Sequence, residues 1–414
     1  MLSGGRGRYG HEPLQLTMKL RIFPGSLRGA LTAPPSKSAL LRLTLLAALG
    51  DGLCEIDCSR LPEDAQYLCR ALAALGASVG EADGRLHIGP IGRPAAEARI
   101  DCGESAAVLR FLLPLAAALG TSVCFTGSAR LLRRPIAPLL RAMEAHGCRC
   151  DTAHGLSVSG RLVPGDYTLP GGVSSQFFSG LLMALPLLPG ESRLRAAGPL
   201  VSAGYIDMTR QMLTRFGVRT ELDGAAYVIP GGQRPSLPAV TAVPGDWSGA
   251  AVWMAANALG SAVTVRGLDP ESPQPDRRIQ DYVNQMPPEL DVSQHPDLLP
   301  MLAVLATAGK HPVRLVNAAR LRTKESDRLR TAAALVTSLG GSAEVREDGL
   351  ALRPGRLRGG TADAAGDHRI AMAAALAATV CTEPVTLAGA DCVKKSYPAF
   401  WEDFYRVGGR FEIS

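Results

Sequence analysis

Two features that the 414-residue sequence lacks exclude whole classes of protein. No uninterrupted apolar run approaches the roughly 18 residues that a membrane-spanning helix needs, so we expect no membrane segment. Aromatic residues make up only 5% of the chain, and its lysines and arginines form no tracts interleaved with aromatics. A base-stacking platform is therefore not expected, and a net charge of +6 suits small anionic ligands without requiring nucleic acid.

A secretory pattern and a recognisable zinc spacing are also lacking. The nine cysteines are an odd number in a long chain, which favours free thiols and a cytoplasmic protein. His146, Cys148, Cys150 and His154 have the composition of a metal site, but their spacing matches no zinc pattern. On a strand, Cys148 and Cys150 would face one side as small core residues. We therefore expect no metal.

What is present is a globular composition with an atypical start. Residues 1–17 are rich in Gly and Arg and have no hydrophobic period, which predicts a disordered leader. The whole chain is 46% hydrophobic and 20% charged, and its length suffices for two or three domains with sizeable cores.

Two kinds of predicted helix alternate along the chain. The first kind is apolar on almost every face, which predicts burial, and begins near residues 38, 104, 175, 248, 297 and 368. The second kind is amphipathic and ends at a glycine before a strand. Six helices of each kind suggest six βαβαββ units and two α/β domains of three units each. The Gly/Pro-rich segment 230–244 is the expected boundary.

The segment Ala33–Gly50 holds the clearest candidate site. Two prolines precede Ser36, which can cap the apolar helix behind it. The unpaired N–H groups at this helix start, together with Lys37, would attract an anion. Arg42 lies four residues after Ser38, on the same helix face. The glycines of a P-loop are missing, so a nucleotide site of that kind is not predicted.

The other buried helices also start with cap residues, and several add a cation or an amide. Each start alone is better explained as a simple helix cap, but the Lys, Arg, Gln and His residues at these starts together favour a site. Parallel core helices would gather their N-termini at one end of each domain, and two facing domains would bring six positive helix ends to one cleft. The six starts read SKS, ESAAVLR, SSQ, DWS, HPD and GDHR.

A second cluster of charge lies between Lys324 and Arg328. These two residues are four apart, as neighbours on one helix face are. Glu325 is flanked by both cations, which would keep its pKa low or make it a competent proton carrier. A salt-bridged, solvated helix start is the plainer interpretation of this motif alone. Arginines ahead of Pro135 add guanidinium groups that bind carboxylate and phosphate, so we expect ligands that carry both.

As a set, these motifs resemble the 5-enolpyruvylshikimate-3-phosphate (EPSP) synthase family, in its order and approximate spacing over roughly residues 19–414. The resemblance implies an inside-out α/β barrel fold of two domains, residues 35–240 and residues 18–34 plus 241–414, with the active site between them. The matching segments are Ser36–Ser38 with Arg42, Val173–Phe177, Tyr205–Asp207, Lys324–Arg328, Asp367–Arg369 and Lys395–Pro398.

The resemblance also implies a reaction. The enolpyruvyl group of phosphoenolpyruvate moves to the 5-hydroxyl of shikimate 3-phosphate through a tetrahedral intermediate, and phosphate leaves, in the shikimate pathway to chorismate and the aromatic amino acids. No cofactor or metal is implied, and a monomer is expected.

Roles of individual residues follow from the same resemblance. Asp297 would face the 5-hydroxyl, and Glu325 and Lys37 are the proton-transfer candidates, with His368 nearby. The implied ligands of shikimate 3-phosphate are Lys37, Ser38, Arg42, Ser174, Ser175, Gln176, Ser202, Tyr205, Asp297 and Lys324. The implied ligands of phosphoenolpyruvate are Lys37, Arg130, Gln176, Arg328, Arg369 and Lys395.

Three other functions were weighed against this one. The sister enzyme that transfers enolpyruvyl to UDP-N-acetylglucosamine lacks the Ser174–Gln176 set found here. A catalytically inactive anion-binding homologue is disfavoured because Glu325, Lys37 and Asp297 are all present. RNA binding is disfavoured by dispersed charge and scarce aromatics, although a salt-sensitive RNA shift would revive it.

The chain departs from the family pattern at two places. The family usually has Asn-x-Gly-Thr where this sequence has Glu104, Ser105, Ala106 and Ala107. The family's polar residue four before the lysine falls on Arg320, so no role is assigned to that position.

The alanine at position 106 leads to a prediction about inhibition. A Cβ where the family has none would narrow the phosphoenolpyruvate pocket, so glyphosate, which is longer than phosphoenolpyruvate, should bind poorly. The inhibition constant of glyphosate measures this directly. A value in the low micromolar range would contradict the expectation.

Overall fold

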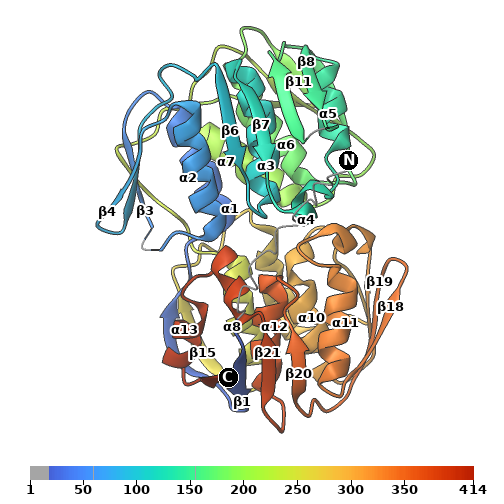
Figure 1. Ribbon diagram of the computed structural model, residues 1–414. Helices are drawn as coiled ribbons and strands as arrows, with labels where there is room; N and C mark the ends of the chain where they lie inside the picture. Colours follow the sequence, from blue (N-terminus) through green and yellow to red (C-terminus); the bar gives the residue numbers. More distant parts are fainter. Residues whose placement is uncertain (1–17, 59, 154) are drawn as a thin grey trace, which may run out of the picture.

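The computed structural model describes residues 18–58, 60–153 and 155–414, so the predicted leader, 1–17, lies outside the described residues. The described chain forms two α/β halves, one above the other (Figure 1). The upper core draws its side chains from residues 40–229, and the lower core from residues 20–31 and 247–407. The expected α/β class is confirmed.

All six predicted buried helices are present, and each begins within two residues of its expected position. They are rich in Ala and Leu, which favour helix, and α12 buries every one of its side chains. The upper half holds α1 (Lys37–Leu49), α3 (Ala106–Leu119) and α6 (Ser175–Ala184), and the lower half holds α8 (Trp247–Ala258), α10 (Leu299–Ala308) and α12 (His368–Ala378).

The amphipathic helices alternate with them. Helix α2 buries Leu68, Leu72 and Leu75 on one face and ends at Gly76, whose φ of 106° suits glycine. The described amphipathic helices are α2 (Glu63–Leu75), α5 (Ala137–Glu144), α7 (Ala203–Arg215), α9 (Ile279–Asn284), α11 (Arg328–Ser338) and α13 (Phe400–Arg406), with a further short helix α4 (Ala129–Leu132).

The strands of the described residues form five four-stranded sheets and one two-stranded pair. The pair joins β2 (Arg28–Thr32) to β15 (Ala262–Arg266) in parallel. Three four-stranded sheets lie in the upper half, in the orders β6 (Glu97–Asp101), β7 (Ser122–Thr126), β9 (Leu156–Gly160), β8 (Cys148–Asp151); β10 (Asp166–Pro170), β11 (Ser192–Ala197), β13 (Ala226–Ile229), β12 (Glu221–Asp223); and β14 (Val240–Ala242), β3 (Cys54–Asp57), β5 (Arg85–Ile88), β4 (Val79–Ala82). Two lie in the lower half, in the orders β16 (Glu289–Asp291), β17 (Val313–Val316), β19 (Gly349–Arg353), β18 (Ser342–Arg346); and β20 (Gly360–Asp363), β21 (Val385–Ala388), β1 (Leu20–Phe23), β22 (Arg410–Ile413).

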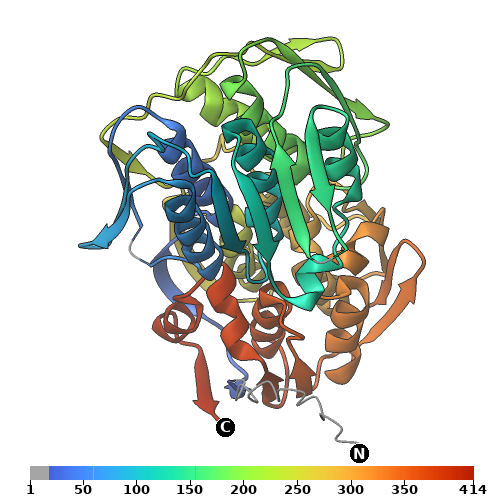
Figure 2. The same ribbon diagram turned by 45° about the horizontal axis from the view of Figure 1, so that its top comes forward.

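These sheets share one internal order. The first two strands run parallel, and the third and fourth are antiparallel to their neighbours. In the lower half the central position of one sheet is taken by β1, which lies between β21 and β22 (Figures 1 and 2). Within the described ranges, no sheet closes on itself as a barrel.

The two halves are joined by two chain segments that lie side by side. The Ser36 N–H donates to the Pro244 carbonyl and the Asp246 N–H to the Pro34 carbonyl, each at 2.8 Å. Position 245 needs glycine, because a Cβ there would lie 2.4 Å from the Gly267 carbonyl oxygen. Ser36 and Asp246 cap α1 and α8, so this junction fixes one buried-helix start in each half beside the other.

The histidine–cysteine cluster weighed as a metal site lies on β8 and its approach. Cys148 belongs to the upper core and Cys150 packs against it, as predicted for small core residues. The His146 ring stacks on Tyr167 with 3.7 Å between ring centroids. His154 lies outside the described residues. All nine cysteines are free thiols.

Among the residues described, no helix combines the length and apolarity that crossing a membrane requires.

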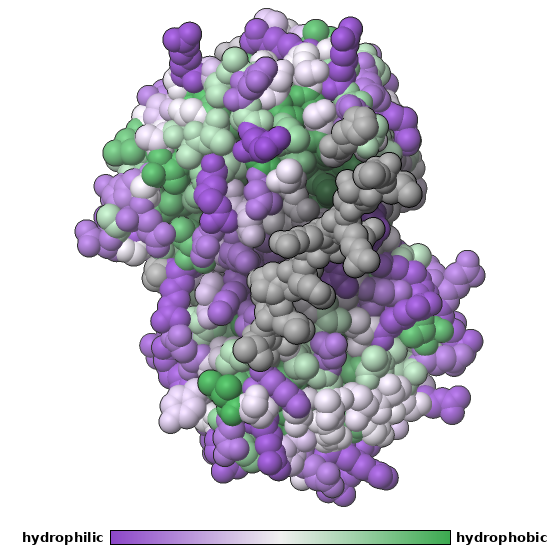
Figure 3. All heavy atoms as spheres, in the orientation of Figure 1, coloured by the Kyte–Doolittle hydropathy of each residue, from purple (hydrophilic) through white to green (hydrophobic). Residues whose placement is uncertain are grey.

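In the space-filling view, hydrophilic side chains border the region where the two halves meet (Figure 3).

Candidate active site

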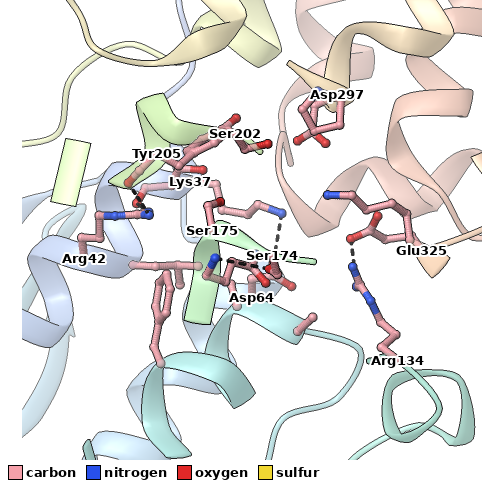
Figure 4. Close-up of a pocket in the computed structure, with 18 of the residues that line it drawn as sticks. Lys37, Arg42, Asp64, Arg134, Ser174, Ser175, Ser202, Tyr205, Asp297 and Glu325 are labelled. Atoms are coloured by element: carbon pink, nitrogen blue, oxygen red, sulfur yellow. Dashed lines mark hydrogen bonds and ion pairs between the residues drawn. The ribbon is translucent and has the colours of Figure 1, made fainter. Parts of the chain in front are cut away.

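A cleft between the halves gathers the starts of the buried helices (Figure 4). It encloses about 780 Å³ of space, including its open mouth. Five of the six buried-helix starts contribute to its lining, and only that of α8 does not. The predicted site residues that line it are Lys37, Ser38, Arg42, Ala106, Ser174, Ser175, Gln176, Ser202, Tyr205, Asp297, Lys324, Glu325 and His368.

Side-chain caps hold these helix starts in place. The hydroxyls of Ser36, Ser105 and Ser174 accept N–H bonds of 3.3–3.4 Å from their own helices. Asp367 accepts in the same way from the Arg369 N–H, at 3.0 Å. Each cap satisfies one of the unpaired donors, and the positive ends of these helices are directed at a common cleft.

The Arg328 guanidinium organises the carboxylates of the lower half. Its side chain is 1% exposed. Its three nitrogens donate to Asp367, Asp297 and Glu325 at 2.8, 2.7 and 2.8 Å. Asp297 receives a second cation, Arg369, at 3.5 Å. The two carboxylates that face the cleft are therefore oriented by a group that solvent does not reach.

The predicted helical spacing of Lys324 and Arg328 is wrong. Lys324 and Glu325 precede the helix in extended and bent backbone, and α11 begins only at Arg328. The reason is the cap: Asp327 accepts from the Arg330 N–H at 3.2 Å and so starts the helix after itself. Glu325 still reaches Arg328, because the turn before the cap folds back on the helix.

The surrounding cations determine the charge of the acidic groups. Burial acts to raise the pKa of the Glu325 carboxyl, but the Arg134 and Arg328 guanidiniums outweigh it and hold that pKa well below its usual value. Likewise, burial opposes ionisation of Asp297, yet Arg328 and Arg369 keep its pKa well below normal. Both carboxylates are ionised at neutral pH.

In two basic groups of the cleft, burial lowers the pKa and favours the neutral form. Burial lowers the pKa of the Lys324 ammonium to about 7, against the attraction of Asp297. Burial and the nearby Lys37 cation hold the pKa of His368 well below its usual value, so this imidazole is neutral. Lys37 itself pairs with Asp64 at 3.0 Å.

The charged groups of the cleft can hold anions and move protons. Comparison with proteins of known function identifies this arrangement. A model of the EPSP synthase (3-phosphoshikimate 1-carboxyvinyltransferase) family matches residues 23–291 and 278–404. The chain belongs to the EPSP synthase family.

Individual relatives agree with this assignment. The 3-phosphoshikimate 1-carboxyvinyltransferase of Clostridium kluyveri is 38% identical, over 94% of this chain and 97% of its own length. That of Clostridium novyi is 36% identical over the same shares. A solved EPSP synthase from Acinetobacter baumannii has a TM-score of 0.80 at 25% identity and covers 96% of this chain and 100% of its own. The predicted family, and with it the transferase activity for which the family is named, is confirmed.

Four predicted site residues lie outside the cleft lining. Arg328 and Arg369 are buried directly behind Asp297. Arg130 and Lys395 lie together on another side, where they donate to the carbonyls of Ala365 and Gly366 at 3.0 and 2.8 Å.

Arg42 is at the predicted place but is already engaged. Its Nε donates to Thr209 at 2.7 Å, its Nη1 to the Ser38 carbonyl at 2.7 Å, and its Nη2 to Ser179 and the Tyr205 carbonyl, each at 3.1 Å. Four of the five N–H groups of this guanidinium are thus used to tie α1 to α6 and α7.

Sequence reasoning gave several contributors no individual role. Arg134 lines the cleft and pairs with Glu325 at 3.3 Å across the halves; its place in an arginine-rich turn was the available signal. Asp64 and Arg320 also line it, and Arg320 donates to the Ser202 hydroxyl at 2.7 Å. Nothing in the local sequence predicts these pairings, because the partners are distant in the chain.

Asp276 is a further missed residue. It is fully buried, and the Tyr205 hydroxyl donates to it across the halves at 2.5 Å. Burial and the neighbouring Asp297 charge raise the pKa of Asp276 to about 6. It therefore carries a proton under conditions in which an unfolded aspartate would not.

This shift predicts a pH-dependent stability. The unfolded carboxyl releases its proton near 3.8 and the folded one near 6, so the free energy of unfolding should fall as pH rises through that window. Asp276→Asn should remove this fall and gain up to about 3 kcal/mol over wild type near neutral pH. Urea unfolding of both proteins at several pH values measures it. Parallel stability curves would contradict the shift.

Proposed function

We propose that the cleft binds phosphoenolpyruvate and shikimate 3-phosphate together and transfers the enolpyruvyl group between them, in the shikimate pathway. The observation that carries the proposal is the meeting of Lys37, Glu325 and Asp297 in one cleft that is ringed by cations from both halves. An ammonium and two ionised carboxylates supply the groups that proton transfer to and from a hydroxyl and a carbon require.

Shikimate 3-phosphate would lie against the upper half. The starts of α6 and α7 offer hydroxyl and amide groups for its ring oxygens and phosphate, and Lys324 reaches toward it from the lower half. Ser38 and Arg42 would act mainly by shaping this wall, since most of the Arg42 donors bind protein. The assigned residues are Lys37, Ser38, Arg42, Ser174, Ser175, Gln176, Ser202, Tyr205, Asp297 and Lys324.

Phosphoenolpyruvate would lie between Lys37 and the arginines behind Asp297. Its phosphate and carboxylate carry the charges that ammonium and guanidinium groups bind. Arg130 and Lys395 lie close enough to the Gly366 turn to complete the set when the anion is present. The assigned residues are Lys37, Arg130, Gln176, Arg328, Arg369 and Lys395.

The reaction then follows from the placement of charge. Asp297 faces the 5-hydroxyl, whose oxygen attacks C2 of phosphoenolpyruvate while the hydroxyl proton is taken up and a proton is added to C3. Loss of phosphate from the tetrahedral intermediate and removal of a C3 proton restore the double bond. Glu325 and Lys37 exchange these protons, and the cations stabilise the departing phosphate.

We also propose how the chain is divided and assembled. Residues 35–240 form one domain and residues 18–34 plus 241–414 the other, except that β14 runs two residues past this boundary where it pairs with β3 of the upper half. Together they make an inside-out α/β barrel of six βαβαββ units, which the separate cores and the repeated sheet order support. A monomer suffices, because one chain lines the whole cleft. Nine free thiols favour the cytoplasm.

The central test is phosphate release from phosphoenolpyruvate, with and without shikimate 3-phosphate. Release should depend on the acceptor and fall roughly 100-fold or more in Glu325→Gln, because a proton-transfer group is lost. Glu344→Gln, an exposed change on β18, is the matched control and should act as wild type. No release by wild type, with both ligands bound, would identify an inactive binding protein instead.

Lys324 allows a second test of the acceptor site. Because its pKa is about 7, affinity for shikimate 3-phosphate should weaken by up to about tenfold per pH unit above that value. Lys324→Arg, which stays charged, should flatten this dependence. Isothermal titration across pH compares the two proteins. An identical pH dependence would remove Lys324 from the phosphate site.

A further inference from the structure

Lys395, assigned above to phosphoenolpyruvate, already has a carboxylate partner. Lys395 ends the 3₁₀ turn Ala390–Lys395 of the lower half, and its side chain is 13% exposed. Its ammonium forms an ion pair with Glu104 and donates to the Gly366 carbonyl at 2.8 Å. Glu104 lies immediately before the Ser105 cap of α3, in the upper half. The pair therefore bridges the two halves.

This bridge spans a second cleft that adjoins the first. The second cleft has about 1780 Å³ of space, including open solvent, and both Glu104 and Lys395 line it. Asp64 lines both clefts, so the two spaces meet at the partner of Lys37. Glu104 thus lies beside Lys395, one of the cations assigned to phosphoenolpyruvate, in a cleft that shares Asp64 with the first.

The chemistry of the pair resembles that of substrate binding. Phosphoenolpyruvate offers carboxylate and phosphate oxygens, and Glu104 offers a carboxylate to the same ammonium. One of the three ammonium N–H groups already binds the Gly366 carbonyl, so holding both anions would bring two negative charges together on a single cation, and their mutual repulsion sets Glu104 against the substrate. Burial acts to lower the pKa of the Lys395 ammonium, but the hydrogen bond that it donates to Glu104 raises this pKa, in keeping with a close pair.

We propose that Glu104 competes with phosphoenolpyruvate for Lys395, weakens the binding of that substrate and holds the halves together before the substrate binds. The inference rests on the proposed assignment of Lys395 to phosphoenolpyruvate. Binding of the substrate then exchanges one carboxylate partner of Lys395 for another and frees Glu104 to solvent, toward which 41% of its side chain is already exposed.

Competition and positioning predict opposite results. If Glu104 competes, its removal leaves Lys395 free for the substrate and the KM for phosphoenolpyruvate falls. If Glu104 only holds Lys395 in place, its removal lets the ammonium move and the same KM rises. The sign of the change therefore separates the two roles.

The experiment is steady-state kinetics of Glu104→Gln with shikimate 3-phosphate saturating. The KM for phosphoenolpyruvate should fall by about twofold to fivefold, as expected for losing a partly exposed ion pair, and the KM for shikimate 3-phosphate should stay the same. Glu63→Gln is the matched control, because Glu63 lines the same cleft and the substitution removes the same charge. Glu63 is exposed and forms no ion pair among the described residues, so the KM of this variant should not change. Glu104→Ala repeats the test without the amide.

The remaining outcomes separate this inference from the proposed function. An unchanged or raised KM in both Glu104 variants overturns the competition, as does an equal fall in Glu63→Gln, which would indicate only the general field of the cleft. Lys395→Met should raise the KM and abolish the effect of Glu104→Gln in the double variant. If Lys395→Met leaves the KM unchanged, the assignment of Lys395 in the proposed function fails.

Discussion

The buried guanidinium of Arg328 is the interaction on which the site depends. It binds carboxylates from three separate segments, Asp297, Glu325 and Asp367, and solvent reaches almost none of it. A buried ion is tolerated only when its partners compensate for lost hydration, and removing one partner of such a pair commonly costs about 3–5 kcal/mol. The starts of α10, α11 and α12 are therefore held to one another by charge, as well as by their apolar packing.

The same buried guanidinium determines whether the active-site carboxyl groups are ionised. Because Arg328 and its neighbours face Glu325 and Asp297 from the buried side, both carboxylates meet the cleft ionised. Arg134 completes the arrangement from the other half. An anionic substrate that enters the cleft must therefore bind the cations of the cleft lining. The buried arginines balance the charge of the carboxylates, so these acids repel the substrate only weakly. Preformed charge of this kind needs little rearrangement during reaction.

The sequence predicted those parts of the fold and site that depend on local pattern. The starts of the buried helices were found because apolar runs and cap residues such as Ser36 and Asp367 lie next to each other in the chain. The helical placement of Lys324 failed because the cap at Asp327 overrode spacing. The pairs Arg134–Glu325 and Tyr205–Asp276 could not be predicted, since partners 191 and 71 residues apart meet only when both halves are folded.

The placement of β1 and β2 bears on the order in which the chain can fold during synthesis. The upper core is built from one continuous stretch, residues 40–229, which leaves the ribosome early. The lower core needs strands from the very beginning of the chain, and β1 is paired on both sides by β21 and β22, which are made last. The first strands must therefore remain without their partners until synthesis is nearly complete, an exposure that long-range pairing imposes and that favours aggregation or chaperone binding in the interval.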